Sequence, residues 1–267
     1  YDVVFEAVRQ TGCALMFASE DLKSNSTIVL EALKDKHLDG RDGSALKYAS
    51  CKLLGNKEFM LNVIGLDGMN LKYASKQLRS DREVVLQAIR HTGKSLAYAS
   101  FELRADKLIV LAAVQSDGTA LQFASKKLQA DWEVVREAIE ESGFAFEFAS
   151  KELRANRVLV LAAVQNYGYA LLYAPDNLRS DKDFILQIVR TKGEALVYAS
   201  NDLRANRHLV IEAIKNNPLA FRYASIELQA DGIVRATAGQ KVADDEILTS
   251  AGEEFDKGDY DSELFDL

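Results

Sequence analysis

The stretch Ser95-Leu-Ala-Tyr-Ala-Ser100 decides the fold, because close variants of it recur along the whole chain. Two of them are Ala120-Leu-Gln-Phe-Ala-Ser125 and Ala195-Leu-Val-Tyr-Ala-Ser200. The last position of the motif occurs nine times, at Ser19, Ser50, Ser75, Ser100, Ser125, Ser150, Pro175, Ser200 and Ser225. The step between successive motifs is constant from Ser50 onward, and only the first step, from Ser19 to Ser50, is longer. A fixed period of this size indicates stacked structural repeats.

The residue pattern within each 25-residue unit predicts two helices. Asp81 precedes an apolar pattern that ends at Gly93, which is typical of a helix of about ten residues with an Asp cap and a glycine at positive φ beyond its end. Leucine and alanine spacing then predicts a second helix from about 94 to 104. The short loops between them favour antiparallel packing. A leucine-rich repeat fits poorly, because the leucines have helical spacing rather than the alternation of a strand. We therefore expect an all-α solenoid of stacked 25-residue antiparallel helix pairs.

Alternate units are more alike than adjacent ones. Residues 103–115 (Leu-Arg-Ala-Asp-Lys-Leu-Ile-Val-Leu-Ala-Ala-Val-Gln) closely match residues 153–165, which lie two units further along. With the Leu-x-Tyr-Ala-Ser motif, these segments make the chain resemble a repeat family of microbial eukaryotes known as domain of unknown function 4116, over residues 1 to about 230. The resemblance implies a repeat array of about two units per family domain. It implies no activity, substrate or site.

The chain divides by composition into a repeat body and an acidic tail. We expect nine units over residues 1–230, with the first one truncated and a polar insert at 36–43 in the second that is a surface turn rather than a calcium loop. Residues 231–267 contain 11 acids and three bases, a net charge of −8 that leaves +1 for the rest of the total of −7. We expect an eroded capping helix from Asp231 and then a mobile acidic tail. Because the chain opens at Tyr1 within a repeat, we expect a fragment or a processed form.

Two columns of basic residues are predicted to line one edge of the solenoid. The first column ends the second helix of each unit, and the second column begins the first helix. Cations at the start of a helix oppose its dipole, so either pairing with nearby acids or an anion-binding edge accounts for them. The candidate binding residues at this basic edge are Arg79, Arg82, Arg104, Lys107, Arg154, Arg157, Arg179, Lys182, Arg204 and Arg207.

Other recurring positions favour structural roles. The aromatic column from Phe17 to Tyr223 is interpreted as packing between units rather than as a platform for stacked bases, and the serine column as bonding back to the preceding turn. Pro175 is expected to kink or end its helix. In the tail, Phe265 and Leu267 are candidate anchors for a domain that captures a carboxylate.

No motif of an enzyme, cofactor site or metal site is recognisable. The three histidines share no ligand spacing, and no glycine-rich phosphate loop appears. The longest apolar runs are too short to cross a membrane, and Cys13 and Cys51 occupy non-equivalent positions, which favours a reducing, intracellular and cytoplasmic location. We expect a non-catalytic scaffold that binds unidentified proteins. The alternative is a nucleic-acid or polyanion binder that uses the basic edge, masked by the tail.

Overall fold

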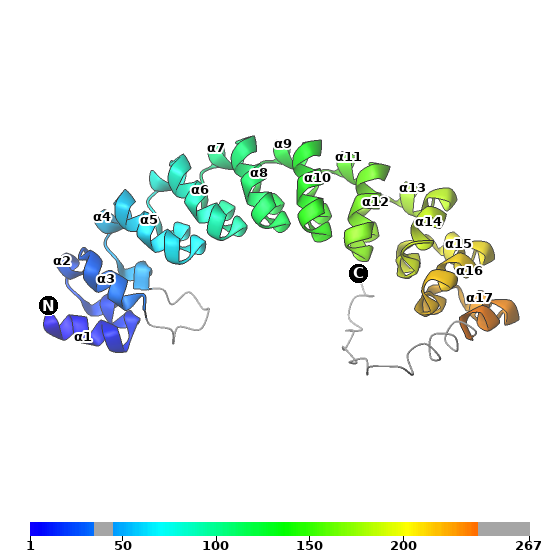
Figure 1. Ribbon diagram of the computed structural model, residues 1–267, viewed down its shortest axis with the longest axis horizontal. Coiled ribbons are helices and arrows are strands. Elements are labelled where there is room, and N and C mark those ends of the chain that lie inside the picture. The colour runs from blue at the N-terminus through cyan, green and yellow to red at the C-terminus, as the bar shows by residue number, and fades with distance from the viewer. Residues whose placement is uncertain (35–44, 240–267) are drawn as a thin grey trace. The chain divides into compact units, whose positions relative to one another are not determined.

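The computed structural model describes residues 1–34 and 45–239, and over these residues it is an all-α repeat solenoid (Figure 1). The chain forms two compact units, Tyr1–Pro175 (unit 1) and Asp176–Leu267 (unit 2). In unit 1 consecutive long helices lie side by side in chain order, with the short helices along the other side of the stack (Figure 1). The insert predicted at 36–43 lies outside the described residues, as do residues 240–267 of the tail.

A long helix opens each repeat, and from the second repeat onward an Asp or Asn caps it as predicted, whereas the first long helix follows Tyr1 and has no side-chain cap. Asp81, for example, accepts hydrogen bonds from the N–H groups of Glu83 and Val84, at 3.0 and 3.2 Å. Residues 232–239 are also helical, and Asp231 accepts the same two bonds at their start. The long helices are α1 Asp2–Gln10, α3 Ser26–Ala32, α5 Lys57–Leu66, α6 Arg82–His91, α8 Lys107–Ser116, α10 Trp132–Glu141, α12 Arg157–Asn166, α14 Lys182–Val189 and α16 Arg207–Asn216.

The second helix of the repeat is not continuous, which corrects the prediction for 94–104. A 3-10 helix, η5 Gly93–Tyr98, is followed by Ala99 in an extended conformation (φ −66°, ψ 156°) and then by the single turn α7 Phe101–Arg104. The same break recurs at Ala174 (φ −73°, ψ 147°). Pro175 is therefore not the cause of the interruption there, because repeats without proline have it too.

The remaining elements follow this three-part pattern. The other 3-10 helices are η1 Gly12–Phe17, η2 Ala45–Tyr48, η3 Gly68–Tyr73, η4 Leu78–Ser80, η6 Gly118–Phe123, η7 Gly143–Phe148, η8 Gly168–Tyr173, η9 Gly193–Tyr198 and η10 Pro218–Tyr223. The other single-turn helices are α2 Glu20–Lys23, α4 Cys51–Leu54, α9 Lys126–Gln129, α11 Lys151–Arg154, α13 Asp176–Arg179, α15 Asn201–Arg204 and α17 Ile226–Ala230.

The recurring serine links neighbouring repeats through its backbone. Ser100 N–H donates to the carbonyl of Arg79 at 2.9 Å, and Ser125 N–H donates to the carbonyl of Arg104 at 2.9 Å. The serine hydroxyl has a second role, because Ser150 Oγ accepts from Leu153 N–H at 3.3 Å and so caps the single-turn helix. In such repeats the predicted bond to a preceding turn is replaced by a cap on the following one, whereas the hydroxyls of Ser19, Ser100 and Ser200 make no cap. Pro175 has no N–H and cannot make the inter-repeat bond.

The recurring glycine is needed for close packing and not for its backbone freedom. None of the glycines at 68, 93, 118, 143 and 193 adopts the left-handed region, contrary to the prediction. A Cβ atom added at Gly118 would lie 2.3 Å from the carbonyl oxygen of Ala138 in the next long helix. The repeats therefore approach one another at a point where only a hydrogen fits beside the backbone.

The core runs along the inside of the stack, and each long helix from α5 onward contributes two buried pairs to it. In α6 these are Val84 and Val85, then Ala88 and Ile89, all at most 1% exposed. The motif leucine, such as Leu96, is completely buried beside them. Neither the long helix nor the single turn is long enough to be stable alone, so packing between repeats stabilises both.

Candidate functional site

The long helices present one outward column of aliphatic side chains. It lies at the fifth residue of the long helices from α3 onward, directly after the first buried pair, and its members are only half-buried. We call this the aliphatic column. In unit 1 it consists of Leu30, Leu61, Leu86, Leu111 and Leu161, with Arg136 at the equivalent position of α10, and in unit 2 of Leu186 and Ile211.

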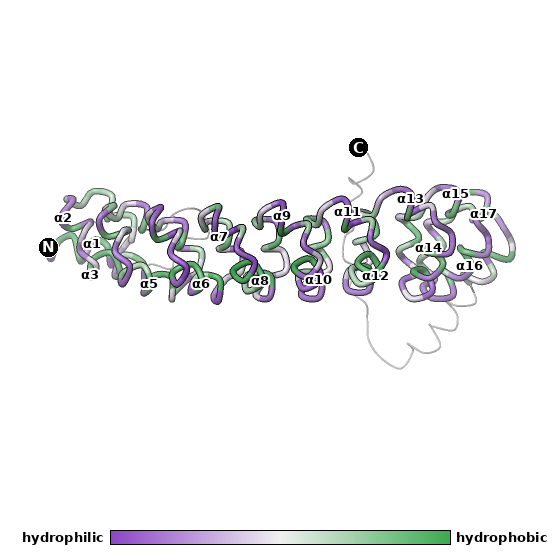
Figure 2. Tube along the Cα trace, turned by 90° about the horizontal axis from the view of Figure 1, so that it is seen from above, coloured by the Kyte–Doolittle hydropathy of each residue, from purple (hydrophilic) through white to green (hydrophobic). Residues whose placement is uncertain are grey.

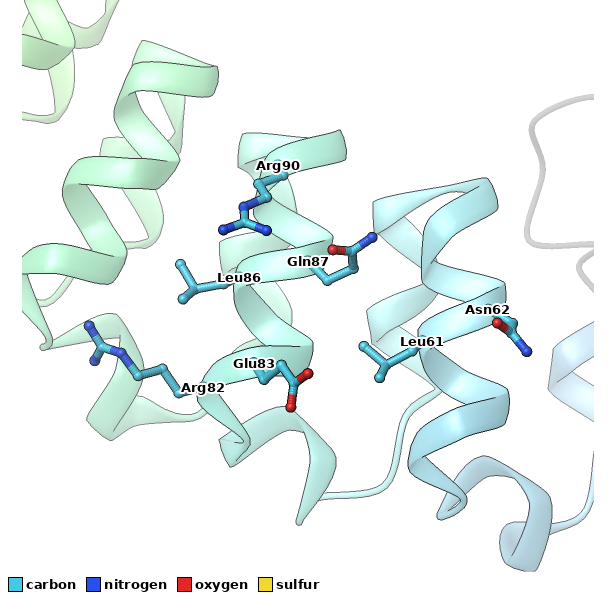
Figure 3. Close-up of a pocket in the computed structure, with 7 residues that line it drawn as sticks. All are labelled: Leu61, Asn62, Arg82, Glu83, Leu86, Gln87 and Arg90. Carbon is cyan, nitrogen blue, oxygen red and sulfur yellow. The ribbon is translucent and has the colours of Figure 1, made fainter.

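A pocket of about 610 Å³ opens on this column and is lined by residues of α5 and α6. Figure 3 shows Leu61 of α5 pointing toward α6, with Leu86 and Gln87 on the neighbouring helix. Arg82 and Arg90 stand at opposite ends of α6 and bound the pocket along its length. The combination of aliphatic, amide and guanidinium groups in an open groove suits a peptide segment better than a small molecule, which needs an enclosed cavity.

The first residue of several long helices forms an ion pair with the cap of the next repeat. Lys107 Nζ lies 2.8 Å from Asp131 Oδ2 and 2.8 Å from Glu133 Oε2. Lys57 makes the same two contacts with Asp81 and Glu83, at 2.8 and 2.7 Å. These pairs explain why a cation stands at the positive end of a helix dipole: it binds the carboxylate that caps its neighbour.

Arg82 and Arg207 extend this series. Arg82 Nη1 lies 2.5 Å from Asp106 Oδ2, and Arg207 Nη2 lies 3.1 Å from Asp231 Oδ1 within unit 2. Lys182 is exposed, and the next cap is the neutral Asn206. The cations and capping aspartates in these ion pairs are between about a quarter and a half exposed, such as 40% for Lys107 and 27% for Asp131, whereas Glu83 and Glu133 are 70% and 58% exposed.

Burial and pairing set the ionisation of these caps. Hydrogen bonding to Lys57 lowers the pKa of the Asp81 carboxyl, and hydrogen bonding to Asp81 and then to Glu83 raises the pKa of Lys57. Burial would raise the pKa of Asp131, but hydrogen bonds from Lys107 and from Val134 N–H outweigh it, so that the pKa lies below its usual value. The caps are therefore carboxylates at neutral pH, and each already has a cation beside it.

The arginines that end the single-turn segments lie half-buried under the next repeat. Arg204 Nε donates to the carbonyl of Tyr223 at 2.6 Å. The Nε atoms of Arg79, Arg104, Arg154 and Arg179 are buried and have no hydrogen-bond partner in the described part of the chain. Their side chains therefore pack between repeats with little of the stem in solvent. The structure brings both columns of the basic edge to the same turns, and it places most of the second column in ion pairs.

The aromatic column is half-buried in the described repeats, except for Phe17 in the first repeat, which is 82% exposed. Tyr173 Oη donates to Glu147 Oε2 at 3.2 Å, and burial, followed by the charge of Glu147, raises the pKa of Tyr173 to about 12. Lysine and arginine groups lie against other rings, as with Lys72 Nζ at 4.9 Å from the Tyr73 ring centre. The candidate tail anchors Phe265 and Leu267 lie outside the described residues.

Within residues 1–34 and 45–239, no three histidine, cysteine or acidic side chains gather as a metal site. None of the helices in these ranges is long and apolar enough to cross a membrane.

Sequence reasoning missed the aliphatic column, and it expected the basic column to pair with nearby acids without identifying the capping aspartates as partners. The aliphatic column was hidden because its residues follow directly after buried valines, as Leu86 follows Val85, and look like core residues. The ion-pair series did leave a signal. Ser26 and Trp132 replace the cation, and the next caps, Asn56 and Asn156, are then neutral.

Comparison with known proteins supports the repeat architecture. A family model described as "Domain of unknown function (DUF4116)" matches residues 1–55, 56–104, 106–154, 156–204 and 181–229. The last two matches overlap, and the second of them begins one repeat after the first, so the family model fits the chain in both registers of the repeat. No curated protein and no solved structure matches the chain.

Proposed function

The chain belongs to the DUF4116 family of tandem repeats, and from this premise we propose that it is a non-catalytic scaffold that binds another protein along the aliphatic column. The observation that carries the proposal is the recurrence of a half-buried leucine at one outward position of the long helices. A repeated surface of this kind offers equally spaced contacts to an extended partner.

The groove between α5 and α6 supports this function. Leu61 and Leu86 supply apolar contact, and Asn62, Gln87 and Arg90 supply hydrogen-bonding groups around them. An apolar centre with a polar rim is the usual composition of a protein interface. The described residues bring together no nucleophile, base and orienting group, so we propose no reaction.

Polyanion binding along the basic edge is the alternative, and the ion pairs weaken it. Lys57, Arg82, Lys107 and Arg207 each lie beside a carboxylate, which reduces the positive potential that a phosphate backbone would meet. A polyanion binder would show an affinity that falls steeply with salt.

Selection from a library of random displayed peptides tests the proposal. We expect ligands that bind the wild-type chain and are lost on the double variant Leu86→Glu/Leu111→Glu. The control is Phe101→Glu, which places the same charge on a side chain of a single-turn helix that is 67% exposed. Circular dichroism confirms that each variant is folded. Ligands that tolerate the double variant would contradict the proposal, and RNA binding with a steep salt dependence would favour the basic edge.

A further inference from the structure

Two long helices of unit 1, α8 and α12, are apolar on nearly every side. Their inner residues are buried, as with Val110 and Val160 at 0% exposure. Their outer faces are apolar as well, since Leu108 is 68% exposed and Val158 is 65% exposed. A helix that is hydrophobic all round is normally buried on all sides, so the outer faces of α8 and α12 lack the cover that their composition calls for. The traces of both helices are predominantly green in Figure 2.

The helix between them adds an exposed tryptophan. Trp132 begins α10 and is 47% exposed, and the Arg136 guanidinium lies 5.8 Å from its ring centre. Trp132 stands where Lys107 and Arg157 carry a cation in the neighbouring repeats. Leu108, Trp132 and Val158 thus occupy the starts of three consecutive long helices, and Leu111 and Leu161 continue the apolar surface along α8 and α12. These five residues form the apolar strip. Tryptophan and arginine are the residues most enriched at energetic centres of interfaces.

The strip itself carries no charge, and the acidic side chains beside it lie on α10, while Lys107 and Arg157 begin α8 and α12. After their first residue, α8 and α12 carry no charged side chain, whereas α10 carries Glu133, Glu137, Glu140 and Glu141 against Arg136. Glu133 is paired with Lys107, and Arg136 contacts both Glu137 and Glu140. Acids at the carboxyl end of a helix oppose its dipole, so Glu140 and Glu141 stand where a cation would stabilise the helix.

We propose that the apolar strip binds an extended, basic segment of another protein, with aliphatic anchors on α8 and α12 and Lys or Arg side chains over α10. This inference rests on the proposed scaffold function and names its partner class. Packed helices lie about 8–10 Å apart, which separates α8 from α12 by about 16–20 Å. An extended chain covers that distance in about five to six residues at ~3.3 Å each. The segment therefore has the pattern Leu-x-Lys-x-Lys-x-Leu, with its alternate side chains facing the strip.

The chain contains a single tryptophan, and it lies in the strip. Titration of the full chain with synthetic peptides of this pattern, randomised at the x positions, therefore reports binding through Trp132 fluorescence. We expect a saturable change in emission, and at least a tenfold weaker affinity for matched peptides that carry Glu in place of both Lys residues. Leu108→Asp/Val158→Asp is expected to weaken binding at least tenfold. Phe101→Asp, a similarly exposed apolar residue on a single-turn helix, is expected to leave it unchanged.

Equal binding of the lysine and glutamate peptides, or no change in Trp132 emission with either, would overturn the proposal. Binding that survives Leu108→Asp/Val158→Asp in a chain with unchanged circular dichroism would overturn it too. The random-library experiment tests the scaffold function separately. If the random library gives ligands that depend on Leu86 and Leu111 but lack the basic, aliphatic pattern, the scaffold stands and this inference falls.

Discussion

Replacing Gly118 by alanine tests the contact that sets the distance between repeats. The new Cβ atom would lie 2.3 Å from Ala138 O and 3.0 Å from Ser142 N, both backbone atoms of the next repeat. An ordinary contact begins near 3.4 Å, so η6 and α10 must separate by 1.1 Å (3.4 − 2.3). Overpacking of this kind costs about 1–3 kcal/mol and occasionally more. The loss of chain entropy in the unfolded state returns about 0.4–1 kcal/mol. Because two backbone atoms block relaxation, we expect a net loss of about 2 kcal/mol.

Urea denaturation followed by Trp132 fluorescence measures this loss, because Trp132 belongs to α10, the helix that must move. The matched control is Gly65→Ala in α5, where an added Cβ meets nothing within 4 Å. There the better helix propensity of alanine should stabilise the chain by about 0.5–1 kcal/mol. If both variants shift the unfolding midpoint in the same direction, close approach is not the reason for the glycine.

Three further changes have defined outcomes. Ser95→Ala should stabilise the chain by about 1 kcal/mol in the same urea assay. Ser95 is 0% exposed, its hydroxyl has no partner among the described residues, and most other repeats have alanine at this position. A loss of stability would reveal a bond that the hydroxyl makes. The pKa of Asp131 is lowered in the folded chain, so its contribution is present above the unfolded value of about 3.9 and is lost as the pH falls through the lower folded value. Asp131→Asn should therefore reduce the loss of thermal stability on going below about pH 4, while an asparagine still caps the helix as Asn156 does; an unchanged acid profile would show that Lys107 adds nothing. Pro175→Ser restores an N–H that can donate to Arg154 O, a bond worth about 0.5–1.5 kcal/mol, and hydrogen exchange at residue 175 should then be as slow as at Ser150; rapid exchange would show that the bond does not form.

The long helices were predictable because their signals are local. An Asp or Asn before a pair of buried apolar residues marks the start of each one after the first, and the structure confirms the cap at Asp81. The second helix was not predictable in detail. Leu96, Ala99 and Leu103 recur at a spacing that suits a helix, yet the chain is extended at Ala99, and Ser100 N–H bonds to the previous repeat. That bond is non-local, and no helical pattern records it.

The candidate site also had one part that the sequence predicted and one part that it did not. The basic edge was predicted from residue type, and both of the explanations offered for it were electrostatic. Choosing between them required the distance from Lys107 to Asp131, two residues that are 24 positions apart. The aliphatic column could not be separated from the core by sequence alone, because Leu86 and Val85 have the same chemistry and differ only in the side of the helix that they face.

The contacts between repeats have an evolutionary consequence. Two of these contacts involve only backbone groups. In the first, the serine N–H donates to a carbonyl of the previous repeat, and in the second, the glycine Cα lies against a carbonyl of the next repeat. Side chains that do not contact a neighbouring repeat can therefore diverge without changing how the unit fits its neighbours. Unequal recombination that duplicates or deletes a whole unit, or a pair of units, then joins compatible ends. Such a gene gains or loses length in whole units. New surfaces then arise by duplication of a unit and substitution of its surface residues, while the core stays the same.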